Sequence, residues 1–282
     1  MSLSGKVSII TGGSIGIGRT IAQAFLKEGA KVIIASRTQE ELERSVKELR
    51  EQGDITGIQT DVSRTEEVGR LVAGALEYFG RVDILVNAAA VQGPIGPLVE
   101  VDIEQWIRCI QVDLIGTVLC CKAVLPVMRN NSKGKIINFS GGGATSARPN
   151  FSAYACAKTA VVRFTETLAM EVAGYNIDVN AIAPGVVKTR MMDEIAKEGS
   201  KAGEQEVAQI EKTVRDGGGS PLPAAELAVF LASDSSNGIT GRLISAVWDD
   251  WRSPDVRDVV LSDSSLYTLR RIDGRSFVGV KK

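Results

Sequence analysis

The feature that most constrains this chain is a regular alternation of short β-branched runs with longer amphipathic stretches. Strand-like runs lie at 6–11, 31–36, 55–60, 82–87, 135–139, 178–183 and 242–247, and helical periodicity is visible at 18–28, 40–52 and 66–79. Strand and helix repeated in this order predict an α/β fold, a doubly wound parallel sheet covered by helices on both faces. Such three-layer sandwiches bind ligands at the carboxyl ends of their strands.

The pattern also predicts how the chain is divided. A length of 282 residues suits one large α/β domain with an appendage, and the alternation stops after residue 247. We therefore expect a single domain over 1–247, with a lid around 191–220 whose segment 197–220, rich in glycine and charge, reads as a mobile loop. Residues 248–282 predict an extension, neither helix nor strand pair, that packs on the core or on a neighbouring subunit. Its aromatic residues are Trp248, Trp251, Tyr267 and Phe277.

Charge and composition favour a small-molecule partner. The chain has 33 basic and 34 acidic residues, so no bulk electrostatic attraction toward nucleic acid or an anionic membrane is expected. The N-terminus lacks the apolar stretch of a signal peptide, and no run approaches the roughly 20 apolar residues of a membrane helix. These observations predict a cytoplasmic protein without membrane or nucleic-acid partners.

Histidine is absent and cysteine is sparse. Any proton transfer must therefore use Tyr, Lys, Asp, Glu or Cys. The four cysteines show no C-x-x-C spacing and lie in apolar, helix-like segments, which predicts buried thiols and no metal site. They are Cys109, Cys120, Cys121 and Cys156.

A glycine-rich turn follows the first predicted strand and opens the first predicted helix. It reads Thr-Gly-Gly-Ser-Ile-Gly-Ile-Gly over residues 11–18. Glycines in this context permit a tight turn, close approach of the backbone to a pyrophosphate, and packing of helix on strand. A structural turn is the alternative, but the order of strand, turn and helix favours a dinucleotide site. The residues assigned to it are Gly12, Ser14, Gly16, Ile17 and Gly18.

The end of the second strand bears on cofactor choice. An Asp or Glu there would bind the ribose hydroxyls of NAD, whereas this chain has Ser36 and Arg37. A guanidinium can bind the 2′-phosphate of NADP with charge-assisted hydrogen bonds. The sequence therefore predicts NADP(H), with NAD(H) as the alternative if Arg37 is only a solvated surface charge.

Two further strand ends carry candidate cofactor contacts. Asp61 and Val62 follow the third strand and are placed to face the adenine, while Asn87, Ala88 and Ala89 follow the fourth and leave room for the cofactor. Either segment can also be an ordinary turn, because Asp and Asn are common in turns.

Tyr154 and Lys158 are four residues apart in a strongly helical segment. This spacing places both side chains on one face of a helix, one turn apart. An ammonium near a tyrosine favours its phenolate, so the pair can donate or accept a proton without histidine. The spacing alone is a common coincidence, and its position after the fifth strand of a nucleotide-binding fold gives it weight.

Four motifs in order make the chain resemble the short-chain dehydrogenase/reductase family over about residues 3–247. They are Thr-Gly-x-x-x-Gly-x-Gly from 11, Asn-Ala-Ala from 87, Tyr-x-x-x-Lys from 154 and Pro-Gly from 184. The resemblance implies a Rossmann-like core, a nicotinamide cofactor, and Tyr154 as proton donor or acceptor. It also implies that Lys158 binds the nicotinamide ribose while lowering the tyrosine pKa. Further implied cofactor contacts are Pro184, Gly185, Val187 and Thr189, and a homodimer or homotetramer is expected through helices over 114–128 and 155–172.

The chain departs from the family pattern at two positions. The family's usual asparagine in the fourth long helix is Asp113 here, whose side chain could serve the substrate or replace asparagine isosterically while a bent helix still offers its carbonyl to a proton-relay water. The family's substrate-orienting serine is usually 13 residues before the tyrosine, a position held here by Gly141. Ser140 is the candidate replacement, because glycines at 141–143 allow unusual backbone angles. The alternative is that Ser140 only bonds the backbone at the strand end.

Together these features predict an NADP-dependent oxidoreductase that transfers hydride between the nicotinamide and a carbonyl or secondary alcohol. Two other classes stay open: a cofactor-binding protein with little catalysis, and an epimerase or dehydratase that uses a transient hydride.

Overall fold

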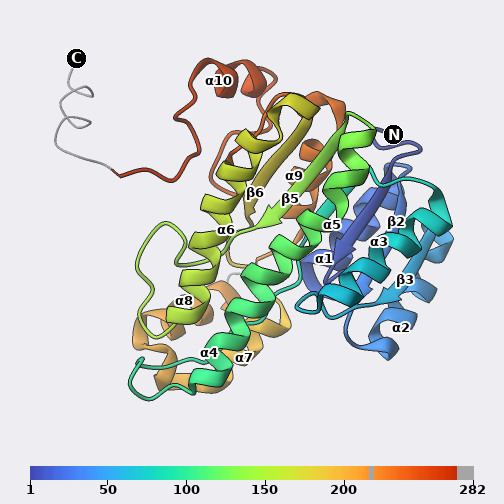
Figure 1. Ribbon diagram of the computed structural model, residues 1–282. Helices are drawn as coiled ribbons and strands as arrows, with labels where there is room; N and C mark the ends of the chain where they lie inside the picture. Colours follow the sequence, from blue (N-terminus) through green and yellow to red (C-terminus); the bar gives the residue numbers. More distant parts are fainter. Residues whose placement is uncertain (216–218, 272–282) are drawn as a thin grey trace, which may run out of the picture.

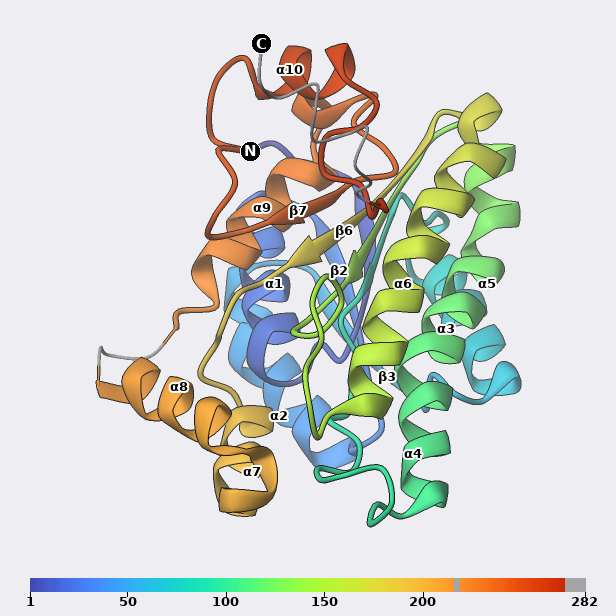
Figure 2. The same ribbon diagram turned by 90° about the vertical axis from the view of Figure 1, so that its left-hand side faces the viewer.

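A parallel sheet forms the centre of the computed structural model, which describes residues 1–215 and 219–271 (Figures 1 and 2). Its strands are β1 (Val7–Thr11), β2 (Lys31–Ser36), β3 (Ile55–Gln59), β4 (Ile84–Asn87), β5 (Gly134–Phe139), β6 (Ile177–Ala183) and β7 (Leu243–Ser245). Their order is β3-β2-β1-β4-β5-β6-β7, and every adjacent pair is parallel. The predicted doubly wound α/β fold is confirmed. The order reverses between β1 and β4, where such sheets bind their ligands.

Helices cover both faces of the sheet. One face carries α1 (Gly16–Lys27), α2 (Gln39–Leu49) and α9 (Leu222–Ala232), and the other carries α3 (Thr65–Phe79), α5 (Gly116–Asn130) and α6 (Ser152–Glu171). Consecutive strand residues serve opposite faces: Ile10 and Ile34 join the first core, whereas Ile9 and Ile33 join the second. The strands are therefore apolar on both sides, which explains why their runs were continuous rather than alternating.

One long helix crosses the second face with a local change of winding. It begins as α4 (Ile103–Ile110), passes through the π-helical turn Gln111–Ile115 and continues as α5. Among the described residues, only this helix has the length and composition of a membrane span, a test that core helices of globular domains also pass. By length and composition alone, the prediction that no run approaches a membrane helix is therefore wrong for this helix. Here its inner side packs on the sheet through Val112, Cys120 and Val124.

The lid region is helical rather than a loop. It contains α7 (Arg190–Glu198), a 3-10 turn over Gly199–Ala202 and α8 (Glu204–Arg215). The loop predicted over 197–220 is therefore wrong up to residue 215. The helices were missed because their few apolar residues at helical spacing are surrounded by charged residues. Three of these apolar residues, Met192, Ile195 and Ile210, pack around the buried ring of Phe151. Figures 1 and 2 place α7 and α8 beyond the carboxyl ends of the strands.

The described part of the extension, residues 248–271, packs on the core of the same chain. It contains the helix α10 (Val256–Ser262). The prediction that it holds no helix is wrong. Val256 and Val260, one turn apart, are buried in the α1–α9 core, but the helix is too short to give a periodic signal. The backbone carbonyl oxygen of Tyr267 accepts a 2.7 Å hydrogen bond from the Leu243 amide. Tyr267 thereby covers part of the free edge of β7. Phe277 lies outside the described residues.

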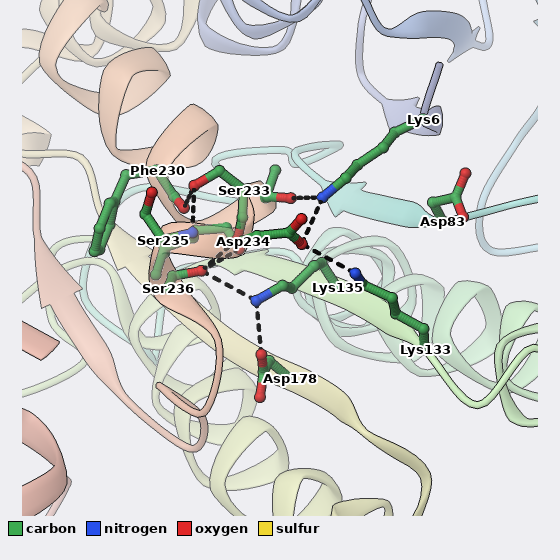
Figure 3. A network of polar contacts seen from close by, with 12 residues as sticks. Lys6, Asp83, Lys133, Lys135, Asp178, Phe230, Ser233, Asp234, Ser235 and Ser236 are labelled. Carbon is green, nitrogen blue, oxygen red and sulfur yellow. Dashed lines mark hydrogen bonds and ion pairs between the residues drawn. The ribbon is translucent and has the colours of Figure 1, made fainter. Parts of the chain in front are cut away.

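A charged network joins the opposite end of the sheet (Figure 3). Lys135 on β5 and Asp178 on β6 are 2.7 Å apart, with side chains only 4% and 10% exposed. Lys6 and Lys133 share the carboxylate of Asp234 at 3.1 and 3.0 Å, and their hydrogen bonds lower the pKa of Asp234 to about 2. These ion pairs tie the amino ends of three strands to the 3-10 turn Asp234–Ser236.

Candidate active site

A cleft of about 430 Å³ opens at the carboxyl ends of the strands, where the strand order reverses. Most of the predicted site residues line it. They are Gly12, Ser14, Gly16, Ile17, Gly18, Ser36, Arg37, Val62, Ala88, Ala89, Ser140, Tyr154, Lys158, Pro184 and Thr189. The cleft thus runs from the β1–α1 turn and the end of β2 to the Tyr-Lys helix α6.

The β1–α1 turn has the geometry of a phosphate cradle. Gly12 and Gly16 adopt positive φ angles of 66° and 55°, which disfavour any side chain. A Cβ at Gly12 would lie 2.9 Å from the Ala88 carbonyl oxygen, and one at Gly18 would lie 2.8 Å from the Gly12 carbonyl carbon. The first turn of α1 has no acidic residue and no side-chain cap, so its free amides face the cleft and fit a dinucleotide pyrophosphate.

The end of β2 carries a cation at the cleft. Arg37 is exposed and lines the cleft, and among the described residues no ion pair engages its guanidinium. Ser36 accepts a 2.9 Å hydrogen bond from the Ser14 hydroxyl, which fixes the turn against β2. The guanidinium of Arg37 is therefore available to a ligand at the place where the adenosine ribose of a dinucleotide would lie.

Four predicted cofactor residues do not line the cleft. The carboxylate of Asp61 forms an ion pair with Arg108 at 2.6 Å and accepts a hydrogen bond from the Ser63 hydroxyl. The Asn87 amide donates to Asn138 at 2.9 Å beneath the cleft floor. Gly185 and Val187 follow Pro184 but also lie outside the lining.

The cleft is also lined by residues that were not assigned to the site from the sequence, several of them direct neighbours of assigned residues. They are Ile15, Ala35, Thr38, Glu41, Thr60, Ala90, Val91, Val112, Phe139, Arg190, Met191 and Glu194. Arg190 on α7 pairs with Glu41 on α2 at 2.5 Å, and this ion pair ties the lid to the wall of the cleft. No local signal links two residues so distant in sequence.

Gly141 lies against the ring of Tyr154. A Cβ at Gly141 would lie 2.8 Å from the Tyr154 Cε1 atom and would also collide with the hydroxyl. The usual serine of this position therefore does not fit the observed arrangement. The absence of a side chain at Gly141 lets the Tyr154 hydroxyl occupy that space.

Ser140 lines the same end of the cleft as Tyr154. It is 3% exposed, and its hydroxyl has no hydrogen-bond partner among the residues that the structure describes. The backbone-bonding alternative for this hydroxyl is therefore not what the structure contains. Burying a hydroxyl without a partner is costly, so this group is available to a ligand oxygen.

Lys158 is held by Asp113. The Lys158 Nζ atom lies 3.1 Å from Asp113 Oδ2, and the two side chains are 4% and 0% exposed. Asp113 Oδ1 accepts the Val91 amide at 2.8 Å, and the Asp113 carbonyl accepts the Thr117 hydroxyl at 2.8 Å. The π-helical turn supplies the predicted bend, but the acidic side chain points to Lys158 rather than into the cleft.

Burial and charge act in opposite directions on the Tyr-Lys pair. Burial raises the pKa of Tyr154, the Lys158 ammonium lowers it and the Asp113 carboxylate raises it, with a net increase. Burial lowers the pKa of Lys158, but the charges of Asp113 and Tyr154 outweigh burial and raise it. The expected lowering by Lys158 is present, yet the protonated tyrosine is the favoured form.

A loop residue connects this site to the lid. The guanidinium of Arg148 stacks on Phe151 at 3.8 Å and lies 5.8 Å from the ring centroid of Tyr154. It also pairs with Glu206 on α8. The lid helix is thus anchored next to the reactive hydroxyl.

Three cysteines are buried and Cys156 is exposed, so the prediction of four buried thiols is wrong at one position. Burial raises the pKa of Cys109 and of Cys120 to about 12. Cys156 lies on the outer side of α6, which faces away from the sheet. Among the described residues, no cluster of three His, Cys, Asp or Glu could hold a metal ion.

The cleft, its glycine cradle and its Tyr-Lys end define a nicotinamide-dinucleotide oxidoreductase of the Rossmann type. The short chain dehydrogenase model matches residues 6–200, more than half of the chain. The protein belongs to the short-chain dehydrogenase/reductase family, whose members use nicotinamide cofactors on small molecules.

Relatives support this membership over most of the chain. Dehydrogenase/reductase SDR family member 4 of Sus scrofa is 36% identical over 248 residues, covering 86% of each protein. An uncharacterized oxidoreductase of Thermotoga maritima is 36% identical and covers 85% of this chain and 93% of its own. The structure of an actinorhodin polyketide ketoreductase with NADPH has a TM-score of 0.80 at 31% identity, covering 85% and 95%. That of an NAD⁺-bound xylitol dehydrogenase has a TM-score of 0.81 at 26% identity, covering 87% and 98%.

Proposed function

We propose that this protein transfers hydride between NADP(H) and the carbonyl or secondary alcohol of a small molecule. The observation that carries the proposal is the convergence of three groups at one end of the cleft: the Tyr154 hydroxyl, the Lys158 ammonium and the unpartnered Ser140 hydroxyl. The other end of the same cleft holds the glycine cradle.

The roles follow from the chemistry of each group. The bound nicotinamide would supply hydride to the carbonyl carbon, or accept it from the alcohol. Ser140 would donate a hydrogen bond to the substrate oxygen, and Tyr154 would give its proton to the alkoxide that forms there. The raised pKa of Tyr154 supports this role, because burial keeps the hydroxyl protonated near neutral pH.

Lys158 would hold the nicotinamide ribose. An ammonium has three donors, and the ion pair of Lys158 with Asp113 at 3.1 Å leaves donors available to ribose hydroxyls, as the family resemblance implies.

The preference for NADP rests on Arg37. A guanidinium free of internal ion pairs at the end of β2 favours a 2′-phosphate, and no carboxylate stands at the adjacent Ser36 to repel it. Among solved structures similar to this chain, the xylitol dehydrogenase is bound to NAD⁺ and the polyketide ketoreductase to NADPH, so the preference depends on this chain's own residue.

Self-association through α4, α5 and α6 is the second part of the proposal. Ile107 on α4, Ile115 on the π-helical turn and Met170 on α6 are 41%, 43% and 83% exposed, and a second copy that packs on these helices would cover apolar side chains of this kind. Light scattering of Met170→Glu against the wild type tests it, since a monomer in the variant only would support this contact and an unchanged assembly would contradict it.

The decisive test of function is Tyr154→Phe, with the exposed Tyr78→Phe as control. NADPH consumption is measured over a panel of ketones, aldehydes and quinones, and cofactor binding by calorimetry. We expect loss of turnover in Tyr154→Phe alone, with binding retained. Turnover equal to wild type would refute the role of Tyr154. Binding without consumption by the wild type would favour the non-catalytic class, and cofactor that recycles without net redox change would favour the epimerase or dehydratase class.

A further inference from the structure

We propose that Asp113 is a positioning residue of the Tyr154–Lys158 pair: its buried carboxylate holds and neutralises the Lys158 ammonium, so that Tyr154 faces an ion pair rather than a lone cation. The inference rests on the proposed function and adds a determinant of its pH dependence. It assigns a role to the acidic residue that replaces the family's asparagine.

The contacts of Asp113 fix the direction of its side chain. One carboxylate oxygen accepts the Val91 amide at 2.8 Å and the other lies 3.1 Å from the Lys158 Nζ atom. The π-helical turn Gln111–Ile115 brings the side chain into the interior, where it is fully buried. π-helical turns are frequent at functional sites because they redirect side chains.

Asparagine at this position would change the charge without changing the shape. Its oxygen could still accept the Val91 amide, but its NH₂ group would then face the Lys158 ammonium, two donors directed at each other. The observed pairing therefore requires a carboxylate. Isosteric filling does not explain why both oxygens are engaged.

The charges around Tyr154 come from several elements. Lys158 lies on α6, Asp113 on the π-helical turn, Arg148 on the loop before α6, and Cys109 on α4. Arg148 is itself paired with Glu206 on the lid, and burial keeps the Cys109 thiol neutral. The Asp113 charge opposes that of Lys158 at Tyr154, although burial raises the pKa of Asp113 itself, and so less positive charge is left to stabilise a buried phenolate.

The consequence is a tyrosine that retains its proton well into the alkaline range. Reduction uses this proton, which passes from the Tyr154 hydroxyl to the substrate alkoxide, and should persist at high pH. Oxidation needs the phenolate as base and should rise only at alkaline pH. Removing the Asp113 charge should shift both pH profiles toward lower pH.

The test is an ultraviolet difference titration that follows phenolate formation by Tyr154, with Tyr154→Phe subtracted as the blank. We expect wild-type Tyr154 to titrate above the range of a free tyrosine, because burial raises its pKa. In Asp113→Asn the midpoint should fall by about one unit or more, a tenfold or larger rise in the ionisation constant. Asp102→Asn, which removes a carboxylate from the start of the same helix, should leave the midpoint unchanged.

An unchanged midpoint in folded Asp113→Asn overturns the inference. If that variant does not fold, the wild-type titration decides: a midpoint below the range of a free tyrosine would mean that Lys158 acts as a lone cation. The titration needs no substrate. A shifted midpoint without turnover in any variant would refute the proposed function only, whereas normal turnover with an unshifted midpoint would refute the role of Asp113 only.

Discussion

The Tyr154 ring lies so close to the Gly141 backbone that a Cβ at Gly141 would be 2.8 Å from the Tyr154 Cε1 atom. We therefore predict that Gly141→Ala displaces the tyrosine and lowers kcat/KM by roughly 100-fold, the order expected for a misplacement of about 1 Å. Gly142→Ala is the matched control, because its Cβ would meet only the flexible end of Arg148 at 3.4 Å.

Steady-state kinetics of both variants measure this effect. Gly141→Ser should be as impaired as Gly141→Ala, although it restores the residue type usual in the family. Wild-type kinetics in either Gly141 variant would mean that the loop readily moves away from Tyr154.

Cofactor choice should depend on Arg37. Arg37→Asp removes the guanidinium and adds a charge that repels a 2′-phosphate, so we expect the KM for NADPH to rise by about 10- to 150-fold, the equivalent of charge-assisted hydrogen bonds worth about 1.5–3 kcal/mol. The KM for NADH should change little. Arg44→Asp, an equal charge change at an exposed position of α2, is the control. An unaltered ratio of the two KM values would contradict the assignment.

Lys135 and Lys133, two of the lysines of the network in Figure 3, should differ strongly in their contribution to stability. Lys135→Met leaves Asp178 buried without its partner, which should lower the free energy of unfolding by about 3–5 kcal/mol. Lys133→Met removes an ion pair whose side chains are 47% and 60% exposed, worth about 0–1 kcal/mol. Urea denaturation followed by circular dichroism compares them, and equal losses would argue against the burial difference.

Thiol labelling should distinguish one cysteine from the others. Native protein at neutral pH should expose Cys156 alone to Ellman's reagent, because burial raises the pKa of the other thiols and blocks access. Unfolded protein should react at all four. Cys156→Ser should abolish the native reaction. Rapid labelling of two or more native thiols would contradict the burial, and none would mean that a partner covers α6.

Local patterns were sufficient for the architecture and for the ends of the cleft. The β-branched runs predicted the seven strands of the sheet, most of which are buried on both faces, and their ends were displaced by at most a few residues. The glycine turn at 11–18 and the Tyr-x-x-x-Lys spacing were readable because each depends on neighbours within one turn or one helix. Family membership followed from the order of these motifs.

Other features depended on residues distant in sequence. The helical lid and α10 were missed because each is held by a few apolar contacts with remote elements, as Phe151 and Trp251 illustrate. The engagement of Asp61 by Arg108 could not be foreseen, since their separation in sequence is large.

The sequence by itself determined the fold class, the glycine cradle and the spacing of Tyr154 and Lys158, because hydrophobic periodicity and helical geometry are local properties. Only the tertiary structure decided that Gly141 makes room for the Tyr154 hydroxyl, that the Ser140 hydroxyl is buried without a partner, and that Asp113 pairs with Lys158. These relationships join β5, α6 and a π-helical turn across the interior. Burial then sets their energetics, because charges and hydroxyls removed from water must find partners in one another.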